Sequence, residues 1–461
     1  MAKFLSPYQF MESGKKLSAR ARFFKYLDWK LFLDVFLLCA FGFLMIASAT
    51  LQKGGAELLV GKQLAAFVIG FGFLVFLALI NYQIFDSQWK IILGTSLSLL
   101  LLVLVIGQVS RGSKSWFNLG VLSFQPAELS KVLCTLVLAS WCSKKERSLE
   151  NIRDLGVPLL IIFAHVFLIL LQPDFGSTLV YFPVLISILF VAGVPLIYLY
   201  ALLFLGALAA GVVLTHTFIS LSPFSPSDGS AVAFFYNSMN FGKEFIWVQC
   251  GAGLFIWFLA YIFRGLKLKI PLLYFLVAHI LFMVAWSTGT LFVQAMKPYQ
   301  ERRLLVFFNP DLDPMGAGYH VIQSVIALGS GKIFGKGLFS GTQGRLGFLP
   351  EQHTDFIYSV LGEELGFLGS ACVLLLYGIL IWRCFAIAMD SRDRFGSLVA
   401  VGIGMSFSFY ILLNLAMSMG IAPVTGLPLP FISYGGSSLI SSLISVGILL
   451  SICVRRFTYT G

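Results

Sequence analysis

The chain has 461 residues, of which 58% are hydrophobic and only 11% are charged, and its formal net charge is +11. A soluble globular protein does not carry so much apolar surface, and a β-barrel would show short alternating segments instead of long apolar runs. The positive charge lies in short loops, which argues against a nucleic-acid-binding surface. The sequence therefore predicts an all-α polytopic membrane protein.

Twelve apolar runs approach the length of about 20 residues that a helix needs to cross a bilayer. They cover residues 31–50, 62–81, 90–108, 125–142, 156–172, 178–193, 195–215, 246–263, 271–292, 356–382, 398–418 and 437–455. The first run follows a basic tail and precedes many others, so we expect a retained span and not a cleaved signal peptide. The seven cysteines lie in or beside these runs without a CxxC pair, which favours small core residues over disulfides or a metal site.

The loops between these runs alternate in charge. The basic set comprises Lys15, Lys16, Arg20, Arg22, Lys25, Lys144, Lys145, Arg147, Arg264, Lys267, Lys269, Arg383, Arg392, Arg394, Arg455 and Arg456. The positive-inside rule places these loops, and with them both termini, in the cytoplasm. We thus expect a basic cytoplasmic tail at 1–30 and a transmembrane domain at 31–455, with loops 109–124, 172–177, 216–245 and 293–355 outside.

A second group of basic residues falls on or near the outer face, where the positive-inside rule disfavours them in short loops. Its members are Lys62, Arg111, Lys114, Lys131, Arg302, Arg303, Lys332, Lys336 and Arg345. The long loop 293–355 can simply tolerate the last three. For the others, an anionic ligand such as a lipid-linked pyrophosphate would supply a reason, because an ionisable group in a membrane is costly without a partner or a task.

Two short patterns carry candidate chemistry. In "QPAELSK", Gln125 and Pro126 predict a helix start, and Glu128 and Lys131 share one helix face, either as a structural ion pair or to hold a cation in a polar cavity. In "NPDLDP", Asp311 and Asp313 fit a simple turn. Asp313 also precedes Gly316 and Gly318, which allow close backbone approach, so it is a candidate general base.

Four separated segments resemble the signatures of the SEDS family (shape, elongation, division and sporulation). They are "SWFNLGVLSFQPAELSK" at 115–131, "LQPDFGST" at 171–178, the run 298–369 that contains "FNPDLDPMGAGYH" and "FLPEQHTDF", and "GLPLPFISYGGSSL" at 426–439. The "GTQ" at 341–343 is more similar to the RodA-like elongation branch of the family than to the FtsW-like division branch.

The resemblance implies a peptidoglycan glycosyltransferase that polymerises lipid II into glycan strands at the outer face of the cytoplasmic membrane and releases undecaprenyl diphosphate. It implies a class B penicillin-binding protein and other elongation-complex membrane proteins as partners, and it leaves open a divalent cation, Mg²⁺ or Mn²⁺. A lipid II flippase, an FtsW-like septal polymerase and a non-enzymatic scaffold are the alternatives.

The resemblance also assigns roles to residues. Asp313 matches the family's essential aspartate, and Trp116 matches a characteristic tryptophan that lines the cavity or sits at the membrane interface. The expected pyrophosphate-binding or supporting residues are Lys62, Arg111, Lys114, Glu128, Lys131, Arg302, Arg303 and His353. His353 and Asp355 are interpreted mainly as a hydrogen-bonded cap of the next span.

The family usually has ten spans, whereas this sequence predicts twelve. The surplus lies in an atypical inserted region at about 216–295. The expected fold is therefore a SEDS-type bundle of about ten transmembrane helices with two additional spans and a large extracytoplasmic loop. Because two added spans preserve sidedness, the catalytic loop at about 293–355 stays outside.

Overall fold

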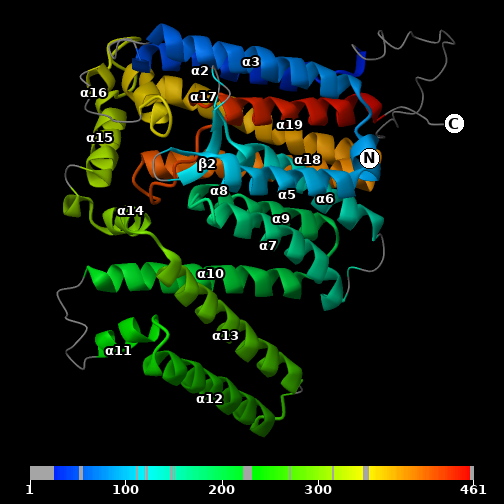
Figure 1. Ribbon diagram of the computed structural model, residues 1–461, viewed down its shortest axis with the longest axis vertical. Helices are drawn as coiled ribbons and strands as arrows, with labels where there is room; N and C mark the ends of the chain where they lie inside the picture. The colour runs from blue at the N-terminus through cyan, green and yellow to red at the C-terminus, as the bar shows by residue number, and fades with distance from the viewer. Residues whose placement is uncertain are drawn as a thin grey trace, which may run out of the picture.

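The computed structural model describes residues 25–50, 56–110, 113–118, 120, 123–145, 149, 151–221, 231–268, 271–313, 316–345 and 352–456. Residues 1–24 of the predicted tail lie outside this set. The described chain is almost entirely helical, and most of its long helices run side by side along one direction (Figure 1). This confirms the all-α membrane fold expected from the sequence.

The elements follow one another from α2 to α19. The long helices are α2 (Trp29–Thr50), α3 (Ala56–Leu79), α5 (Trp89–Ile106), α6 (Pro126–Lys144), α7 (Gly156–Leu170), α10 (Leu196–Ser220), α12 (Lys243–Gly265), α13 (Leu272–Ala295), α17 (Ile357–Asp390), α18 (Arg394–Ser418) and α19 (Gly436–Arg455). The shorter ones are α4 (Gln83–Ser87), η2 (Ile152–Leu155), α8 (Phe175–Leu179), α9 (Tyr181–Val191), α11 (Ala231–Ser238), α14 (Pro298–Phe308), η3 (Pro310–Leu312), α15 (Ala317–Ser330) and α16 (Thr342–Arg345). A small antiparallel sheet has the order β1 (Gln108–Ser110), β2 (Ser113–Asn118) and β3 (Ser123–Phe124), with Gln108 opposite Trp116 and Phe117 opposite Phe124.

Each of the twelve predicted spans corresponds to a helix, but two of them differ from the rest. Within the described residues, ten helices are long and apolar enough to cross a membrane, and α6 and the broken helix α8–α9 are not among them. Helix α6 carries Glu128, Lys131 and Lys144, and the apolar stretch Phe175–Val191 is shorter than a full span. Charged side chains therefore weaken the apolar signal of α6. A break after Leu179 shortens the apolar stretch of α8 and α9.

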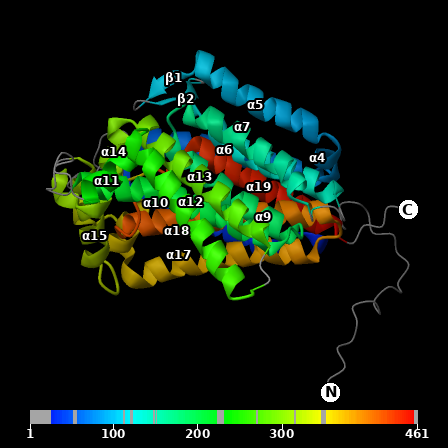
Figure 2. The ribbon, with the colours of Figure 1, turned by 90° about the horizontal axis from the view of Figure 1, so that it is seen from below.

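Contacts between the helix ends define two ends of the bundle. At one end, which we call the basic end, Asp28 before α2 pairs with Arg383 near the end of α17, and Lys144 pairs with Asp86. The same end holds the pairs Lys145–Asp154 and Arg456–Asp390. At the other end, which we call the loop end, Ser48 of α2 donates to Glu364 near the start of α17 at 2.5 Å. Figure 2 shows β1, β2, α11, α14 and α15 together at this loop end.

The loop after α15 is bonded to a kink in α17. Gly366 has φ 66° and interrupts the helix. Across the break, the amides of Lys336 and Gly337 donate to the carbonyls of Glu363 and Glu364, both at 3.0 Å. In return, the amides of Phe367 and Leu368 donate to the carbonyls of Lys332 and Ile333 at 2.8 and 3.1 Å. Irregular backbone at a membrane boundary is tolerated because its polar groups are paired in this way.

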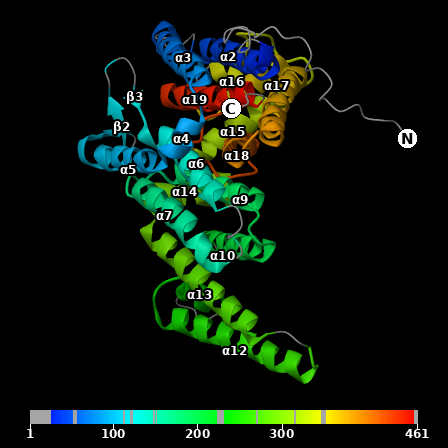
Figure 3. The same ribbon diagram turned by 90° about the vertical axis from the view of Figure 1, so that its right-hand side faces the viewer.

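Helices α12 and α13 form a hairpin that extends away from the rest of the bundle (Figures 1 and 3). Helix α13 packs on α10 where a Cβ on Gly289 would lie 2.7 Å from the Val212 side chain, so only a glycine permits this approach. A small core of Val212, Met239 and Trp286 joins α10, α11 and the hairpin. The hairpin lies within the inserted region predicted at 216–295.

Candidate active site

A cavity of about 210 Å³ lies at the loop end, where segments far apart in the sequence meet. It is lined by β2, the first turn of α6, residues 173–177, the end of α13, α14, Asp355 and residues 423–428. The wall contains the indole of Trp116 and the guanidinium of Arg303. Its carboxylates are those of Glu128, Asp174 and Asp355. Every one of the four family-like segments contributes to this wall.

The predicted pair of Glu128 and Lys131 is buried beside the cavity, and Glu128 lines it. As predicted, Gln125 is the N-cap of α6 and Pro126 its first residue, which orients Glu128 toward the cavity. The Lys131 ammonium donates to Glu128 Oε1 at 2.7 Å, and the two side chains are only 5% and 7% exposed. A pair so deeply buried costs desolvation energy, and it persists only where further hydrogen bonds satisfy both groups.

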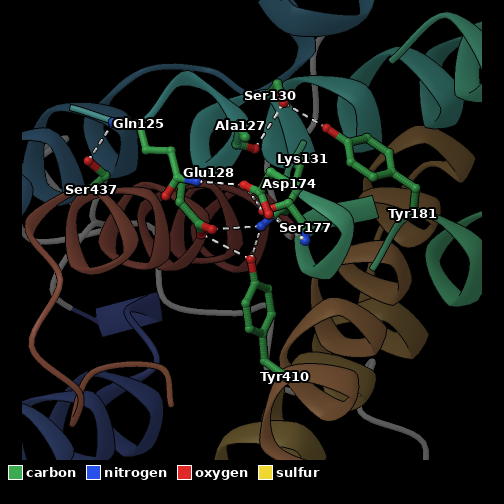
Figure 4. Close-up of polar contacts among 10 residues, drawn as sticks. All are labelled: Gln125, Ala127, Glu128, Ser130, Lys131, Asp174, Ser177, Tyr181, Tyr410 and Ser437. Carbon is green, nitrogen blue, oxygen red and sulfur yellow. Dashed lines mark hydrogen bonds and ion pairs between the residues drawn. The ribbon is translucent and has the colours of Figure 1, made fainter. Parts of the chain in front are cut away.

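Asp174 forms a second acidic wall that the sequence analysis did not single out. It is the N-cap of α8 and accepts hydrogen bonds from the Ser177 amide at 3.2 Å and the Ser177 hydroxyl at 2.8 Å. The Gln125 side-chain amide also donates to it at 2.7 Å (Figure 4). Aspartate before a helix start is the sequence signal that could have identified it.

Arg303 and Asp355 both line the cavity beside Gly426. A Cβ built on Gly426, which has φ +75°, would lie 3.8 Å from Arg303 Nη1 and 3.7 Å from Asp355 Oδ2. The cavity thus presents one guanidinium to an anion, together with carboxylates and amides that can accept and donate hydrogen bonds to sugar hydroxyls and amides. Among the predicted cations whose positions the structure describes, Arg303 alone lines the cavity.

Asp313, the predicted general base, lies directly after η3 and is half-buried, but it is not among the residues that line this cavity. A Cβ on Gly316 would lie 2.2 Å from Asp313 Oδ2, and one on Gly318 would lie 2.0 Å from the Pro310 carbonyl. The predicted close approach of these glycines therefore occurs against their own loop. Asp311 is exposed, and its amide donates to the Asn309 side chain at 3.1 Å, which confirms the turn interpretation.

The other predicted site residues are spread over the loop end. Lys62 on α3 and Arg302 on α14 do not line the cavity, and Arg111 lies outside the described residues. The Lys114 ammonium donates to the Val105 carbonyl at 2.9 Å and so caps the end of α5. Lys336 pairs with Glu363 at 2.7 Å.

The N-cap residue of α17 is Phe356, which follows Asp355 directly and makes no side-chain capping bond, so the capping role expected of His353 and Asp355 stays a prediction. The ring of His353 lies 5.5 Å from that of Tyr434. In the part of the chain that the structure describes, no three His, Cys, Asp or Glu side chains are placed to hold a metal ion. Tyr410, which no motif singled out, completes the buried pair behind the cavity.

Comparison with known proteins agrees with this architecture. A family model described as Cell cycle protein, for FtsW, RodA and SpoVE, matches residues 28–242 and 247–457. The peptidoglycan glycosyltransferase RodA of Treponema pallidum is 34% identical over 437 residues, which cover 93% of this chain and 98% of the relative. The peptidoglycan glycosyltransferase MrdB of Escherichia coli K12 is 31% identical over 94% of either chain.

Solved structures show the same fold. A chain from a peptidoglycan synthase complex that coordinates polymerization and crosslinking has a TM-score of 0.63 and 30% identity, over 94% of this chain and 99% of that one. The crystal structure of Thermus thermophilus RodA gives a TM-score of 0.57 at 25% identity, over 94% and 98%. Since the family model covers nearly the whole chain and the curated relatives exceed 30% identity along most of their length, the chain belongs to the FtsW/RodA/SpoVE family of cell cycle proteins, the SEDS family.

Proposed function

We propose that this multi-pass membrane protein is a peptidoglycan glycosyltransferase that polymerises lipid II into glycan strands. The observation that carries the proposal is the cavity at the loop end, where all four family segments bring together Trp116, Glu128, Asp174 and Arg303. The relatives that match nearly the whole chain are named peptidoglycan glycosyltransferases. The RodA and MrdB relatives support a role in cell elongation.

In the proposed reaction, the 4-hydroxyl of one lipid II molecule attacks the anomeric carbon of the growing strand. The new carbon–oxygen bond forms as the bond from that carbon to the diphosphate oxygen breaks, and undecaprenyl diphosphate leaves with the bonding electrons. Arg303, which lines the cavity, would stabilise the charge that develops on the diphosphate. Trp116 and the cavity carboxylates would orient the sugars.

Asp313 is the proposed general base that accepts the hydroxyl proton. Its support is its place in the matching family segment, which also supplies Gln300 and Arg303 of α14 to the cavity wall. The carboxylate is held against the Gly316 backbone, which restricts its orientation. A general base typically contributes about 10²–10⁴-fold to the rate.

The basic end is the proposed cytoplasmic side of the bacterial inner membrane. Lys144, Lys145, Arg383 and Arg456 form ion pairs there, and Arg455 donates to the Ala78 carbonyl at 3.1 Å. The positive-inside rule then puts the cavity on the outer face, where lipid II is polymerised. A membrane-bound crosslinking transpeptidase, of the class B penicillin-binding type, is the proposed partner, because a similar chain is part of a synthase complex.

The test compares Asp313→Ala with Asp311→Ala in the purified full-length protein supplied with labelled lipid II, with and without the partner. Asp311 is the matched control because it is an exposed aspartate of the same loop. We expect Asp313→Ala to lose about 10²–10⁴-fold in polymerisation rate and Asp311→Ala to stay within about threefold of the wild type.

Polymerisation by Asp313→Ala at the wild-type rate would refute the base assignment. If the wild-type protein, reconstituted in vesicles, moved labelled lipid II across the bilayer without producing polymer, the flippase alternative would replace the polymerase proposal.

A further inference from the structure

The ammonium of Lys131 is held from two helices. It donates to Glu128 Oε1 on its own helix and to the Tyr410 hydroxyl on α18, and it lies 4.9 Å from the centroid of the Tyr410 ring. Lys131 and Tyr410 are each only 6% exposed. Tyr410 therefore contacts this cation through its hydroxyl, which lies between the ring and the ammonium.

Hydrogen bonds join Lys131, Tyr410 and Glu128 in a closed ring. An ammonium can only donate, a carboxylate can only accept, and a tyrosine hydroxyl can do both at once. Tyr410 accepts from Lys131 and donates to Glu128 Oε2 at 2.9 Å, while Lys131 donates to Glu128 Oε1 at 2.7 Å (Figure 4). Both carboxylate oxygens of Glu128 are thereby fixed, one by each partner.

The helix packing keeps this ring in place. Helix α18 approaches α6 so closely that a Cβ on Gly402 would lie 2.5 Å from Thr135 Cγ2. Thr135 is one turn beyond Lys131, and its hydroxyl donates to the Lys131 carbonyl at 2.8 Å. On the other side of α6, the Ser130 and Tyr181 hydroxyls lie 2.6 Å apart. The spacing of α6 and α18 thus sets the distance from Tyr410 to Glu128.

We infer that Tyr410 is a positioning residue for glycosyl transfer, which orients the Glu128 carboxylate toward substrate in the cavity while it holds the Lys131 ammonium. Glu128 lines the cavity, and its remaining acceptor sites can bind a sugar hydroxyl or amide. When a substrate group hydrogen-bonds to the Glu128 carboxylate, the Lys131 ammonium still donates to the Tyr410 hydroxyl, so the buried cation keeps a partner. The inference rests on the proposed function, because it requires lipid II in this cavity.

The test uses Tyr410→Phe, which removes the hydroxyl and keeps the ring. Tyr82→Phe is the matched control, because the Tyr82 hydroxyl also donates to a carboxylate, that of Asp393, and Tyr82 is 2% exposed at the basic end. The purified full-length variants are compared by initial rates of lipid II polymerisation and by their thermal unfolding midpoints.

We expect Tyr410→Phe to lower kcat by about 10- to 100-fold, because a misplaced catalytic group costs rate even when the substrate still binds. Its KM should change by less than about threefold, since the effect is on transition-state geometry. Tyr82→Phe should polymerise at the wild-type rate. Each variant loses one bond from a hydroxyl to a carboxylate, and Tyr410→Phe also loses the bond accepted from Lys131, so its unfolding midpoint should fall at least as far as that of Tyr82→Phe.

Wild-type kcat in Tyr410→Phe would overturn the positioning role. An equal loss of rate in the two variants would also overturn it, because the effect would then follow from lost stability alone. If the wild-type protein forms no polymer, the proposed function fails first and takes this role with it. Active wild type with unaffected Tyr410→Phe removes only the role of Tyr410.

Discussion

Replacing Lys131 with methionine would leave a carboxylate buried without its cation. Met is similar in length and apolar, so the substitution removes the charge and little volume. Glu128 would keep the Tyr410 hydroxyl at 2.9 Å but lose the ammonium at 2.7 Å, in a site where both side chains of the pair are less than a tenth exposed. Removing one partner of such a pair costs about 3–5 kcal/mol, because the remaining charge is uncompensated.

The double variant Lys131→Met with Glu128→Gln separates charge from packing. Here both charges are gone, and the Tyr410 hydroxyl can still donate to the side-chain carbonyl oxygen of the introduced glutamine. Replacement of both partners by neutral groups of similar shape is often close to neutral for stability. At about 1 °C per kcal/mol for a chain of 461 residues, the single variant should lower the thermal unfolding midpoint by about 3–5 °C, and the double variant should recover most of this loss.

The assay is thermal unfolding of the purified protein in one detergent, followed by intrinsic fluorescence, with polymerisation measured in parallel. Both variants should be inactive, since the single variant lacks the cation that holds Glu128 and the double variant lacks the carboxylate that faces the cavity. Equal losses of midpoint in the single and double variants would refute the reasoning, because the buried charge would not be the source of the instability.

Two glycine substitutions test the geometry of the loop end. Gly316→Ala would place a Cβ 2.2 Å from Asp313 Oδ2, so we expect polymerisation to fall by about 10²-fold or more with little change in unfolding midpoint, whereas Gly329→Ala in α15, where a Cβ meets nothing within 4 Å, should remain active. Gly366→Ala would force φ 66° on a residue with a side chain and set its Cβ 2.2 Å from the Gly335 amide, which should lower stability by more than about 2 kcal/mol. Gly378→Ala lies in the same helix with open space around it and should be neutral or stabilising in a thermal unfolding measurement.

The apolar runs predicted the helices well because a membrane requires long uninterrupted helical segments. The pair in "QPAELSK" could also be predicted, since residues three apart on a helix are neighbours whatever the rest of the chain does. Trp116 was assigned through the family resemblance and Arg303 first through its charge and predicted sidedness, and both line the cavity. Reasoning from charge and sidedness also assigned Lys62, Lys114 and Arg302 to this ligand, but none of them lines the cavity. Charge and sidedness do not tell where a side chain points.

What the sequence could not predict depends on contacts between distant segments. Tyr410 meets Glu128 across 282 residues of chain, and Lys114 turns back to a carbonyl of α5. Asp355 sits just before α17 like a capping residue, yet it lines the cavity beside Gly426. Such assignments need the helix packing, which no local pattern encodes.

The length of α13 links the cavity to the thickness of the bilayer. Helix α13 has 24 residues, or about 36 Å at 1.5 Å per residue, and the hydrocarbon core is about 30 Å thick. A helix longer than the core tilts, and it tilts more as the membrane thins. Because Phe292 and Met296 at its end form part of the cavity wall, lipid chain length becomes a physical variable that acts on the shape of this cavity.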